Sequence, residues 1–455
     1  MSDHNFDVLV IGGGPGGYTA AIRATQLGFS VGLAERAELG GVCLNWGCIP
    51  TKSLLHTADV MREAASASVL GLDIGKPKFN LKKVIKRSRD VAGQLSGGIS
   101  FLMKKNGITV FEGDASFTDK NTVIVGNDTI VADNIIIATG ASARDLPHIA
   151  VDGKRIWDAR SAMTPSFMPK KLLIIGAGAI GVEFASFYNT IGANVTLVEV
   201  MDQILPAEDV EIAELAKQSF AAQGIEVLTG TGVDELKVTD KKLTAMIAGA
   251  ERKFDAAILS VGVSGNVDGL GLDAVGVEID RSFISVDEYQ QTSVDGIYAI
   301  GDVAGVPCLA HKASHEGIVA IEGIAGEMPN PINKARIPGC TYSHPQIASI
   351  GLSEAAASEE GEIKVGRFPL LANGKAVAIN DTEGLVKTIF DASSGALLGA
   401  HLIGPGVTEM IQGFAIAIGL ETTEQQLMET IFPHPTLSEA MHESVLSAYG
   451  RTINL

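Results

Sequence analysis

The chain has 455 residues and a formal net charge of −18, from 35 basic and 53 acidic side chains. Such acidity argues against nucleic acid or an anionic membrane surface as a partner, and no apolar run approaches the length of a membrane span. The length suggests roughly three domains, and 46% hydrophobic residues with 52 glycines are typical of an α/β enzyme with many tight turns.

A dinucleotide-binding fingerprint opens the chain. A buried strand is predicted over residues 7–11, followed by three spaced glycines, a helix through Leu27 and a second strand over 30–34 that ends at Glu35. The three glycines are Gly12, Gly14 and Gly17. They let the backbone approach a pyrophosphate at the helix N-terminus, and the acid can accept a hydrogen bond from a ribose. The structural alternative is a βαβ turn without a ligand.

Two of only four cysteines, Cys43 and Cys48, lie close together in the next segment. No second Cys/His pair follows at metal-ligand spacing, so a redox-active disulfide fits better than a metal site. Few cysteines and no export signal indicate a reducing cytoplasm, where a disulfide is usually transient and catalytic. The alternative is a pair of ordinary buried thiols.

Helix geometry constrains this pair. On a regular helix, residues at this spacing are separated by about 140° and roughly 8.7 Å between Cα atoms. A disulfide tolerates no more than about 7 Å, so a bridge requires a distorted helix. Gly47 and Pro50 are the expected weak points. Lys52 follows Cys48 by one turn, where its charge favours a thiolate.

The chain then passes through a predicted helical, basic-sided segment over 76–107. Residues 111–131 alternate between apolar and polar and contain Gly-Asn turns, which predicts antiparallel strands. A buried strand is predicted over 134–140, where it stops at a turn of small residues.

The opening pattern recurs from residue 171, with a strand over 171–175, three glycines, a helix to Thr190, a strand over 194–198 and Glu199. The glycines are Gly176, Gly178 and Gly181. In both copies the acid lies 23 positions after the first glycine (12 to 35, and 176 to 199), so two bound dinucleotides are expected. No Arg or Lys directly follows Glu199, which favours NAD over NADP.

Another buried strand is predicted over 255–263, and a later one ends in Gly301-Asp302. That aspartate can bind a sugar-alcohol chain, or it can simply cap a turn before a helix near His311. From about residue 336, strands over 384–390 and 397–403 and late helices indicate a separate α+β domain. The acidic stretch 353–361 is expected to be a solvated helix face without chemistry.

His434 lies between two prolines near the C-terminus, shortly before Glu439. The structural alternative for Glu439 is that it forms a capping box with Thr436. A histidine held by a carboxylate is also a general base of suitable pKa, and a dithiol reaction needs a proton acceptor.

Taken together, these motifs resemble the flavin-dependent pyridine nucleotide-disulfide oxidoreductases over essentially the whole chain. The most specific runs are Gly-Gly-x-Cys-Leu-Asn-x-Gly-Cys-Ile-Pro-Thr-Lys, ending at Lys52, and His-Pro-Thr-Leu-Ser-Glu, ending at Glu439. The resemblance implies an α/β fold with two Rossmann-like dinucleotide-binding domains and a C-terminal α+β dimerisation domain. The expected parts are an FAD-binding domain over 1–145, an NAD-binding domain over 146–265, a return to the FAD and central domain over 266–335, and an interface domain over 336–455.

The resemblance also implies the cofactors FAD and NAD and residues that bind them. Glu35 is expected on the adenosine ribose of FAD, Asp302 on the ribitol and Ala310 near the isoalloxazine. The expected FAD contacts are Gly12, Gly14, Gly17, Glu35, Arg36, Gly41, Lys52, Gly113, Asp114, Thr139, Gly140, Asp302, Leu309, Ala310 and His311. The expected NAD contacts are Gly176, Gly178, Ile180, Gly181, Glu183, Glu199 and Gly262.

For catalysis the resemblance implies oxidation of protein-bound dihydrolipoamide. Cys43 would exchange with the substrate, and Cys48 would lie against the flavin. Lys52, paired with Glu183, would sit near the flavin's reactive nitrogen. The base would be His434, oriented by Glu439 and contributed by the other subunit of a homodimer.

The implied partner is the lipoyl domain of a multienzyme complex acyltransferase or a glycine cleavage carrier protein. No cysteine follows Cys340, which disfavours a mercuric reductase or a large thioredoxin reductase, and Glu199 disfavours an NADP-preferring glutathione reductase. Residues 262–266 lack an arginine that many relatives carry, so the NAD contacts there are less defined. The alternative of another class is a flavin-binding signalling protein that would have lost a cysteine of the pair or His434.

Overall fold

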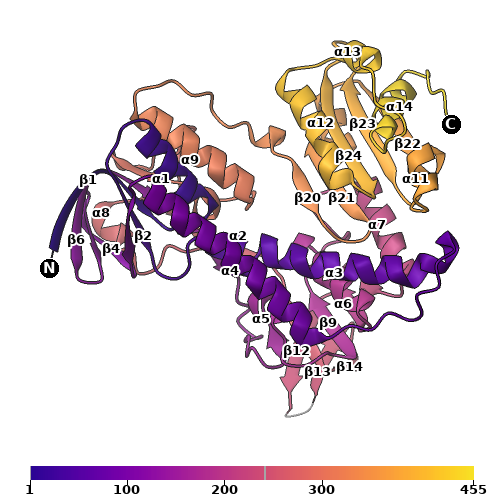
Figure 1. Cartoon of the computed structure of the whole chain (residues 1–455), viewed down its shortest axis with the longest axis horizontal. Helices are drawn as coiled ribbons and strands as arrows, with labels where there is room; N and C mark the ends of the chain where they lie inside the picture. The colour runs from indigo at the N-terminus through magenta and orange to yellow at the C-terminus, as the bar shows by residue number, and fades with distance from the viewer. Residues whose placement is uncertain (1, 240–241) are drawn as a thin grey trace. The chain divides into compact units, whose positions relative to one another are not determined.

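The computed structural model describes residues 2–239 and 242–455, and its chain divides into two compact units (Figure 1). The first unit comprises Met1–Leu54, Lys82–Arg144 and Gly262–Ile332. The second comprises Leu55–Leu81, Asp145–Val261 and Asn333–Leu455. The four-part division expected from the sequence stays a prediction.

A seven-stranded sheet forms the centre of the first unit, in the order β3-β2-β1-β6-β5-β4, with β19 also paired to β6. The strands are β1 (Ser2–Ile11), β2 (Val31–Glu35), β3 (Thr109–Glu112), β4 (Ala115–Asp119), β5 (Thr122–Val125), β6 (Asp128–Ile137) and β19 (Ile297–Ala299). The apolar ends of β1 and β6 are buried on both faces, as expected of central parallel strands.

Two of these strands differ from the prediction. β3 lies parallel to β2, with Thr109 opposite Gly32, because several helices lie between them in the chain and return it in the same direction. β4, β5 and β6 do form the predicted antiparallel strands. β1 begins at Ser2 rather than Asp7, because its polar first half pairs with the first half of β6.

Helices α1 (Pro15–Gln26) and α9 (Ala310–Ile324) lie side by side in this unit (Figure 1). Glycines allow the close crossing, since a Cβ added at Gly317 would lie 2.9 Å from the Gly16 carbonyl oxygen. Arg23 and Glu322 form an ion pair at 2.7 Å across the same helices. The remaining elements of the unit are α2 (Gly41–Trp46), the first part of α3 (Cys48–Ser66), α4 (Leu81–Lys105) from Lys82 onward, β7 (Ala141–Ala143), β16 (Val263–Gly265), α8 (Leu272–Val275), β17 (Ile279–Asp280), β18 (Phe283–Ile284) and η2 (Gly301–Ala304).

The second unit contains a five-stranded parallel sheet in the order β11-β10-β9-β15-β8. These strands are β8 (Ile156–Trp157), β9 (Lys171–Ile175), β10 (Asn194–Val198), β11 (Glu226–Leu228) and β15 (Ala256–Leu259). The other elements are η1 (Ala67–Leu70), α5 (Ala159–Met163), α6 (Ala179–Thr190), α7 (Val210–Ala222) and an antiparallel sheet of β12 (Val233–Val238), β13 (Leu243–Ile247) and β14 (Ala250–Phe254). β9 and β10 have the bounds that the second fingerprint predicts.

The C-terminal part of this unit is the predicted α+β arrangement, an antiparallel sheet in the order β20-β21-β24-β23-β22. Its strands are β20 (Gly339–Thr341), β21 (Gln346–Gly351), β22 (Ile363–Pro369), β23 (Leu385–Asp391) and β24 (Leu397–Gly404). Its helices are η3 (Lys334–Arg336), α10 (Glu354–Glu360), η4 (Leu370–Ala372), α11 (Gly374–Ala378), α12 (Val407–Gly419), α13 (Glu424–Glu429) and α14 (Glu439–Ala448). Helices α12 and α14 pack on the sheet around an apolar core (Figure 1). Among the described residues, no helix has both the length and the apolar character needed to cross a membrane.

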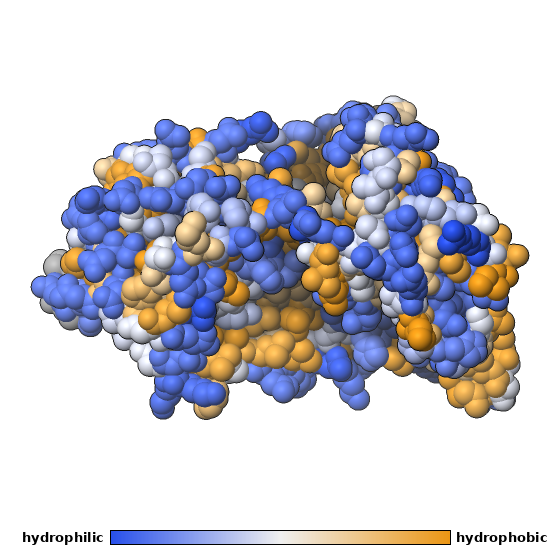
Figure 2. Space-filling view, turned by 90° about the horizontal axis from the view of Figure 1, so that it is seen from above, coloured by the Kyte–Doolittle hydropathy of each residue, from blue (hydrophilic) through white to orange (hydrophobic). Residues whose placement is uncertain are grey.

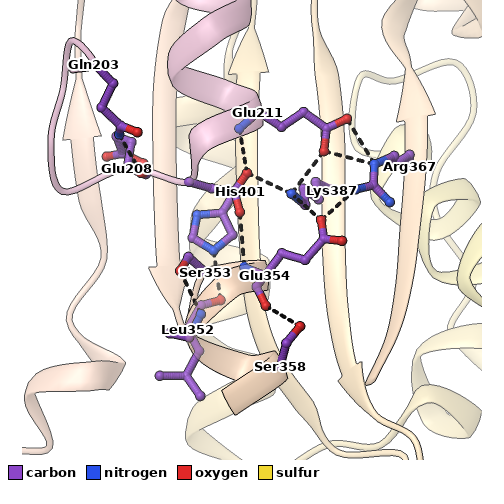
Figure 3. Close-up of polar contacts among 12 residues, drawn as sticks. Gln203, Glu208, Glu211, Leu352, Ser353, Glu354, Ser358, Arg367, Lys387 and His401 are labelled. Atoms are coloured by element: carbon purple, nitrogen blue, oxygen red, sulfur yellow. Dashed lines mark hydrogen bonds and ion pairs between the residues drawn. The ribbon is translucent and has the colours of Figure 1, made fainter. Parts of the chain in front are cut away.

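An ionic cluster around a buried lysine joins α7, α10 and β23 (Figure 3). Lys387, only 1% exposed, places Nζ 2.7 Å from Asp209, 2.9 Å from Glu211 and 2.7 Å from Glu354. Arg367 pairs with both glutamates. Residues 353–361 were expected to form a solvated helix face, and Glu354 departs from that expectation because it pairs with Lys387 and Arg367 on neighbouring strands.

Candidate functional site

The helix that carries the cysteine pair is interrupted where a bridge requires it. Helix α2 ends at Trp46, Gly47 has a non-helical backbone (φ −146°, ψ −118°), and α3 begins at Cys48. Gly47 is thus the predicted weak point. Pro50 is not, because it lies in the first turn of α3, where a helix does not need its N–H.

The interruption brings the two thiols into contact. Cys43 is half-buried, Cys48 is exposed, and their side chains share a hydrogen bond without a disulfide. That hydrogen bond, together with burial and the charge of Cys48, raises the pKa of Cys43, while Lys52 acts in the opposite direction. The pair is therefore a dithiol at contact distance, which loss of two electrons and two protons would convert into a disulfide.

Two arginines on α4 brace this segment and were not predicted from the sequence. Arg89 donates a hydrogen bond to the Asn45 carbonyl and lies 3.7 Å over the Trp46 ring, at the end of α2. Arg87 donates to Ser53 Oγ at 2.7 Å on α3. One helix thereby holds both sides of the interruption. No local motif marks these contacts, because the partners are distant in sequence.

The first glycine fingerprint forms a cradle at the N-terminus of α1. A Cβ at Gly12 would lie 2.2 Å from the Ala138 carbonyl oxygen, and one at Gly17 would lie 1.8 Å from the Gly12 oxygen. At Gly14 an added Cβ would meet nothing within 4 Å, and no side chain caps the helix there. Two glycines are therefore required by packing, whereas the third borders open space beside unpaired helix N–H groups, which suits a pyrophosphate.

The second fingerprint repeats this geometry at the N-terminus of α6. A Cβ at Gly176 would lie 2.3 Å from the Ser260 carbonyl oxygen, and one at Gly181 would lie 2.0 Å from the Gly176 oxygen. Gly178 again borders open space, and α6 has no side-chain cap. Both cradles therefore fit a dinucleotide.

The two acids at the ends of the fingerprints also match. Glu35 Oε2 accepts a 2.7 Å hydrogen bond from the N–H of Gly13, and Glu199 Oε2 accepts one of 2.7 Å from Ala177. In each case the other oxygen accepts from the N–H two residues further along. Each carboxylate is thus fixed beside its own glycine turn, at the edge where a ribose would lie.

Other expected FAD contacts line the same edge of the first unit. Gly41 closely approaches Gly14, and the N–H of Gly113 donates to the Glu35 carbonyl at 3.0 Å. Arg36 and Asp114 form an exposed pair at 3.9 Å. Lys52 lies on α3.

Thr139 and Gly140 are held by a residue that has no role predicted from the sequence. Asn266 Nδ2 donates to the Thr139 carbonyl at 2.8 Å, and its own carbonyl accepts from Thr139 Oγ1 at 2.8 Å. Its N–H donates to the Gly140 carbonyl at 2.9 Å.

Asp302 lies in η2, ahead of the N-terminus of α9. Burial raises the pKa of Asp302, and the positive charge of Lys312 opposes this. Leu309 is the N-cap residue of α9, Ala310 is its first residue, and no side chain caps it. His311 follows and is exposed.

The remaining residues expected to contact NAD differ in how much of their surface is exposed. Ile180 is 45% exposed near the start of α6, whereas Glu183 is 6% exposed and accepts a 2.9 Å hydrogen bond from the N–H of Tyr342. The pairing of Lys52 with Glu183 joins the two units and stays a prediction. An arginine does approach Gly262, since a Cβ there would lie 3.8 Å from Arg144 Cζ.

The C-terminal motif forms a hydrogen-bonded histidine and carboxylate. His434 Nδ1 lies 2.9 Å from Glu439 Oε1, and the N–H of Thr436 donates to Glu439 Oε2 at 2.9 Å. Only half of the capping box forms, because Thr436 Oγ1 donates to the Pro433 carbonyl. Although burial opposes it, these two hydrogen bonds lower the pKa of Glu439. The carboxylate can therefore orient the imidazole.

Family comparisons cover nearly the whole chain. Residues 6–317 match the model described as pyridine nucleotide-disulphide oxidoreductase, and residues 337–445 match its dimerisation domain. The chain is 54% identical over 466 residues to the dihydrolipoyl dehydrogenase of Zymomonas mobilis, with 100% of each chain covered. It is 49% identical over 478 residues to that of Rhizobium etli, with 99% of each covered.

Solved structures agree with these matches. LpdA of Mycobacterium tuberculosis has a TM-score of 0.91 and 27% identity, over 98% of this chain and 99% of that one. The HOCl-induced flavoprotein disulfide reductase RclA of Escherichia coli has a TM-score of 0.88 and 27% identity, over 96% and 99%. With its paired thiols and two dinucleotide cradles, the chain belongs to the pyridine nucleotide-disulphide oxidoreductase family.

Proposed function

We propose that this chain is a dihydrolipoyl dehydrogenase, which oxidises protein-bound dihydrolipoamide to lipoamide and reduces NAD to NADH through Cys43 and Cys48. The observation that carries the proposal is the interruption of the helix at Gly47, which gives the two thiols a shared hydrogen bond. The full-length similarity to dihydrolipoyl dehydrogenases supports the choice of substrate.

In the proposed half-reaction, a thiol of dihydrolipoamide gives its proton to His434. The resulting thiolate attacks Cys43 Sγ, the bond between Cys43 and Cys48 breaks, and Cys48 leaves as a thiolate. The second substrate sulfur then displaces Cys43, which forms lipoamide and leaves the electron pair on the two protein sulfurs. The second proton stays on Cys43, in accord with its raised pKa beside Cys48. The charge of Lys52 favours the thiolate form of the pair.

His434 is suited to this task by its contact with Glu439. Because a carboxylate only accepts hydrogen bonds, Nδ1 carries the proton and Nε2 is the basic nitrogen. Glu439 then stabilises the imidazolium that forms when Nε2 takes a proton. We assign His434 to the active site of a second copy, as in the expected homodimer.

The first cradle is proposed to hold FAD through Glu35, Asp302 and the N-terminus of α1, and the second to hold NAD through Glu199. FAD supplies the conversion of dithiol electrons into hydride transfer to NAD. We accordingly propose residues 1–145 and 266–335 as the FAD-binding and central parts, 146–265 as the NAD-binding domain and 336–455 as the interface domain.

A homodimer is supported by the match of residues 337–445 to a dimerisation domain. Several large apolar side chains in this range are exposed, among them Leu371 at 70%, Leu420 at 75% and Ile431 at 94%. Such residues are typical of surfaces that a partner covers. Hydrophobic residues also interrupt the hydrophilic surface on the face drawn in Figure 2. The proposed partner of the dimer is a lipoyl domain. The proposed location is the cytoplasm, where a catalytic disulfide can be reduced.

Steady-state turnover of the FAD-loaded protein tests this proposal. Dihydrolipoamide and reduced glutathione are each supplied with NAD and with NADP. We expect dihydrolipoamide with NAD to exceed every other combination in kcat/KM by roughly a hundredfold or more. Cys43→Ser should abolish turnover while FAD stays bound. Preference for glutathione, or the absence of dithiol turnover, would contradict the proposal.

A further inference from the structure

A buried ion pair lies beneath the turn that carries Asp302. Lys312 and Glu316, one helical turn apart on α9, are 2% and 3% exposed, and their side chains meet at 2.9 Å. Burying two charges costs desolvation free energy, so such a pair is weak evidence for a role in stability alone. Its other contacts indicate what it positions.

Both members of the pair bind the backbone of the turn. Lys312 Nζ donates to the carbonyls of Gly301 at 3.1 Å and Gly305 at 2.9 Å, so together with Glu316 it has an acceptor for each of its three N–H donors. Glu316 Oε2 accepts from the N–H of Gly301 at 2.7 Å. Gly301 is thus held at both its N–H and its carbonyl.

Asp302 is the next residue after this doubly held glycine. The pair therefore holds the peptide bond that precedes Asp302. Lys312 also supplies the positive charge that opposes the effect of burial on the Asp302 carboxyl. Glu316 in turn neutralises the charge of Lys312. Asp302, Lys312 and Glu316 together therefore carry one net negative charge, which belongs to Asp302.

We infer that Lys312 and Glu316 are positioning residues that hold the Asp302 carboxylate in place to accept hydrogen bonds from the ribitol hydroxyls of FAD. This inference rests on the proposed contact between Asp302 and FAD. Neither residue needs to touch the cofactor, because each acts through the backbone of Gly301 and the charge on Asp302.

A double-mutant cycle on FAD affinity tests the inference. Glu316→Gln keeps the shape of the side chain but introduces an amide N–H₂ where only acceptors suit Gly301 and Lys312. The dissociation constant of FAD is measured by flavin fluorescence in the wild-type protein, Glu316→Gln, Asp302→Asn and the double variant. We expect Glu316→Gln to weaken FAD binding about tenfold when Asp302 is present, and less than twofold in the Asp302→Asn background.

Glu322→Gln is the matched control on the same helix, because Glu322 pairs with Arg23 and not with the turn. It should change FAD affinity less than twofold. If Glu316→Gln does not fold, Lys312→Arg replaces it in the same cycle, since arginine keeps the charge but cannot reproduce the three compact contacts.

The outcomes separate the inference from the proposed function. If Asp302→Asn weakens FAD binding but the effect of Glu316→Gln is the same in both backgrounds, the pair acts only on the general fold and the inference is wrong. An equal loss in Glu322→Gln would also overturn it. If Asp302→Asn itself leaves FAD affinity unchanged, the proposed contact of Asp302 fails first and the inference falls with it.

Discussion

His434 Nδ1 lies 2.9 Å from Glu439 Oε1, while the other oxygen of Glu439 accepts the N–H of Thr436. The carboxylate is thus fixed by the backbone before it orients the ring. The His434 side chain is 76% exposed in the single chain, so Nε2 is accessible to another molecule. This is the arrangement expected of a base that serves a site on a partner.

His434→Gln should slow the dithiol half-reaction by roughly a hundredfold or more, because glutamine cannot accept the substrate proton. Stopped-flow reduction of the FAD-loaded protein by dihydrolipoamide, without oxygen and without NAD, measures that step. His148→Gln, at an exposed histidine, is the control and should keep the wild-type rate. A change of less than about threefold in His434→Gln would count against its role as the base.

Glu199→Gln should reduce the preference for NAD over NADP by about tenfold, because one charged hydrogen-bond acceptor is lost and repulsion of a 2′-phosphate is removed. Glu35→Gln is the matched control, since Glu35 makes the equivalent bonds in the first cradle. It should weaken FAD binding and leave the nucleotide preference unchanged. If both variants change the same property, the two cradles are wrongly assigned.

Lys387→Met should lower the free energy of unfolding by about 3–5 kcal/mol, because the buried Asp209 would lose its ion pair while Glu211 and Glu354 would keep only Arg367. Urea unfolding at fixed FAD concentration measures the change. Lys86→Met removes an exposed ion pair with Asp90 and should cost less than about 1 kcal/mol. Equal losses in the two variants would show that burial of the cluster contributes nothing.

His344 should make stability dependent on pH. Burial, with a smaller effect of Arg62, lowers the pKa of His344 to about 4, below the usual 6.5. The folded chain therefore binds fewer protons than the unfolded chain between these values, and the contribution of His344 is complete above pH 6.5 and lost as pH falls towards 4. Urea unfolding between these pH values should show a flatter pH dependence in His344→Gln. The control His148→Gln should keep the wild-type pH dependence of the free energy of unfolding. A wild-type pH dependence in His344→Gln would contradict the role of His344.

Features encoded by short runs of residues could be predicted from the sequence. The second fingerprint gives the bounds of β9 and β10, and the need for a broken helix locates Gly47 between the cysteines. Each follows from spacing, glycine and apolar pattern within one segment. The parallel pairing of β3 was not predicted, because its partner β2 lies beside it in the sheet but far from it along the chain.

The bracing residues could not be predicted, because their partners lie far away along the chain. Asn266 holds Thr139, and Glu354 shares Lys387 with α7, across contacts that no local period encodes. Lys312 and Glu316 are one helical turn apart, yet their role depends on their hydrogen bonds to the backbone of Gly301. Burial and partners, rather than residue type, distinguish such side chains from ordinary surface charges.

Differential alkylation of the thiols tests the central claim most directly. The oxidised, FAD-loaded protein is treated with iodoacetamide before and after one equivalent of dihydrolipoamide without oxygen, and the labelled cysteines are identified by mass spectrometry. We predict that Cys43 and Cys48 become labelled only after reduction, while labelling of Cys308 and Cys340 does not change. Labelling of Cys43 and Cys48 that is the same before and after dihydrolipoamide would contradict the account.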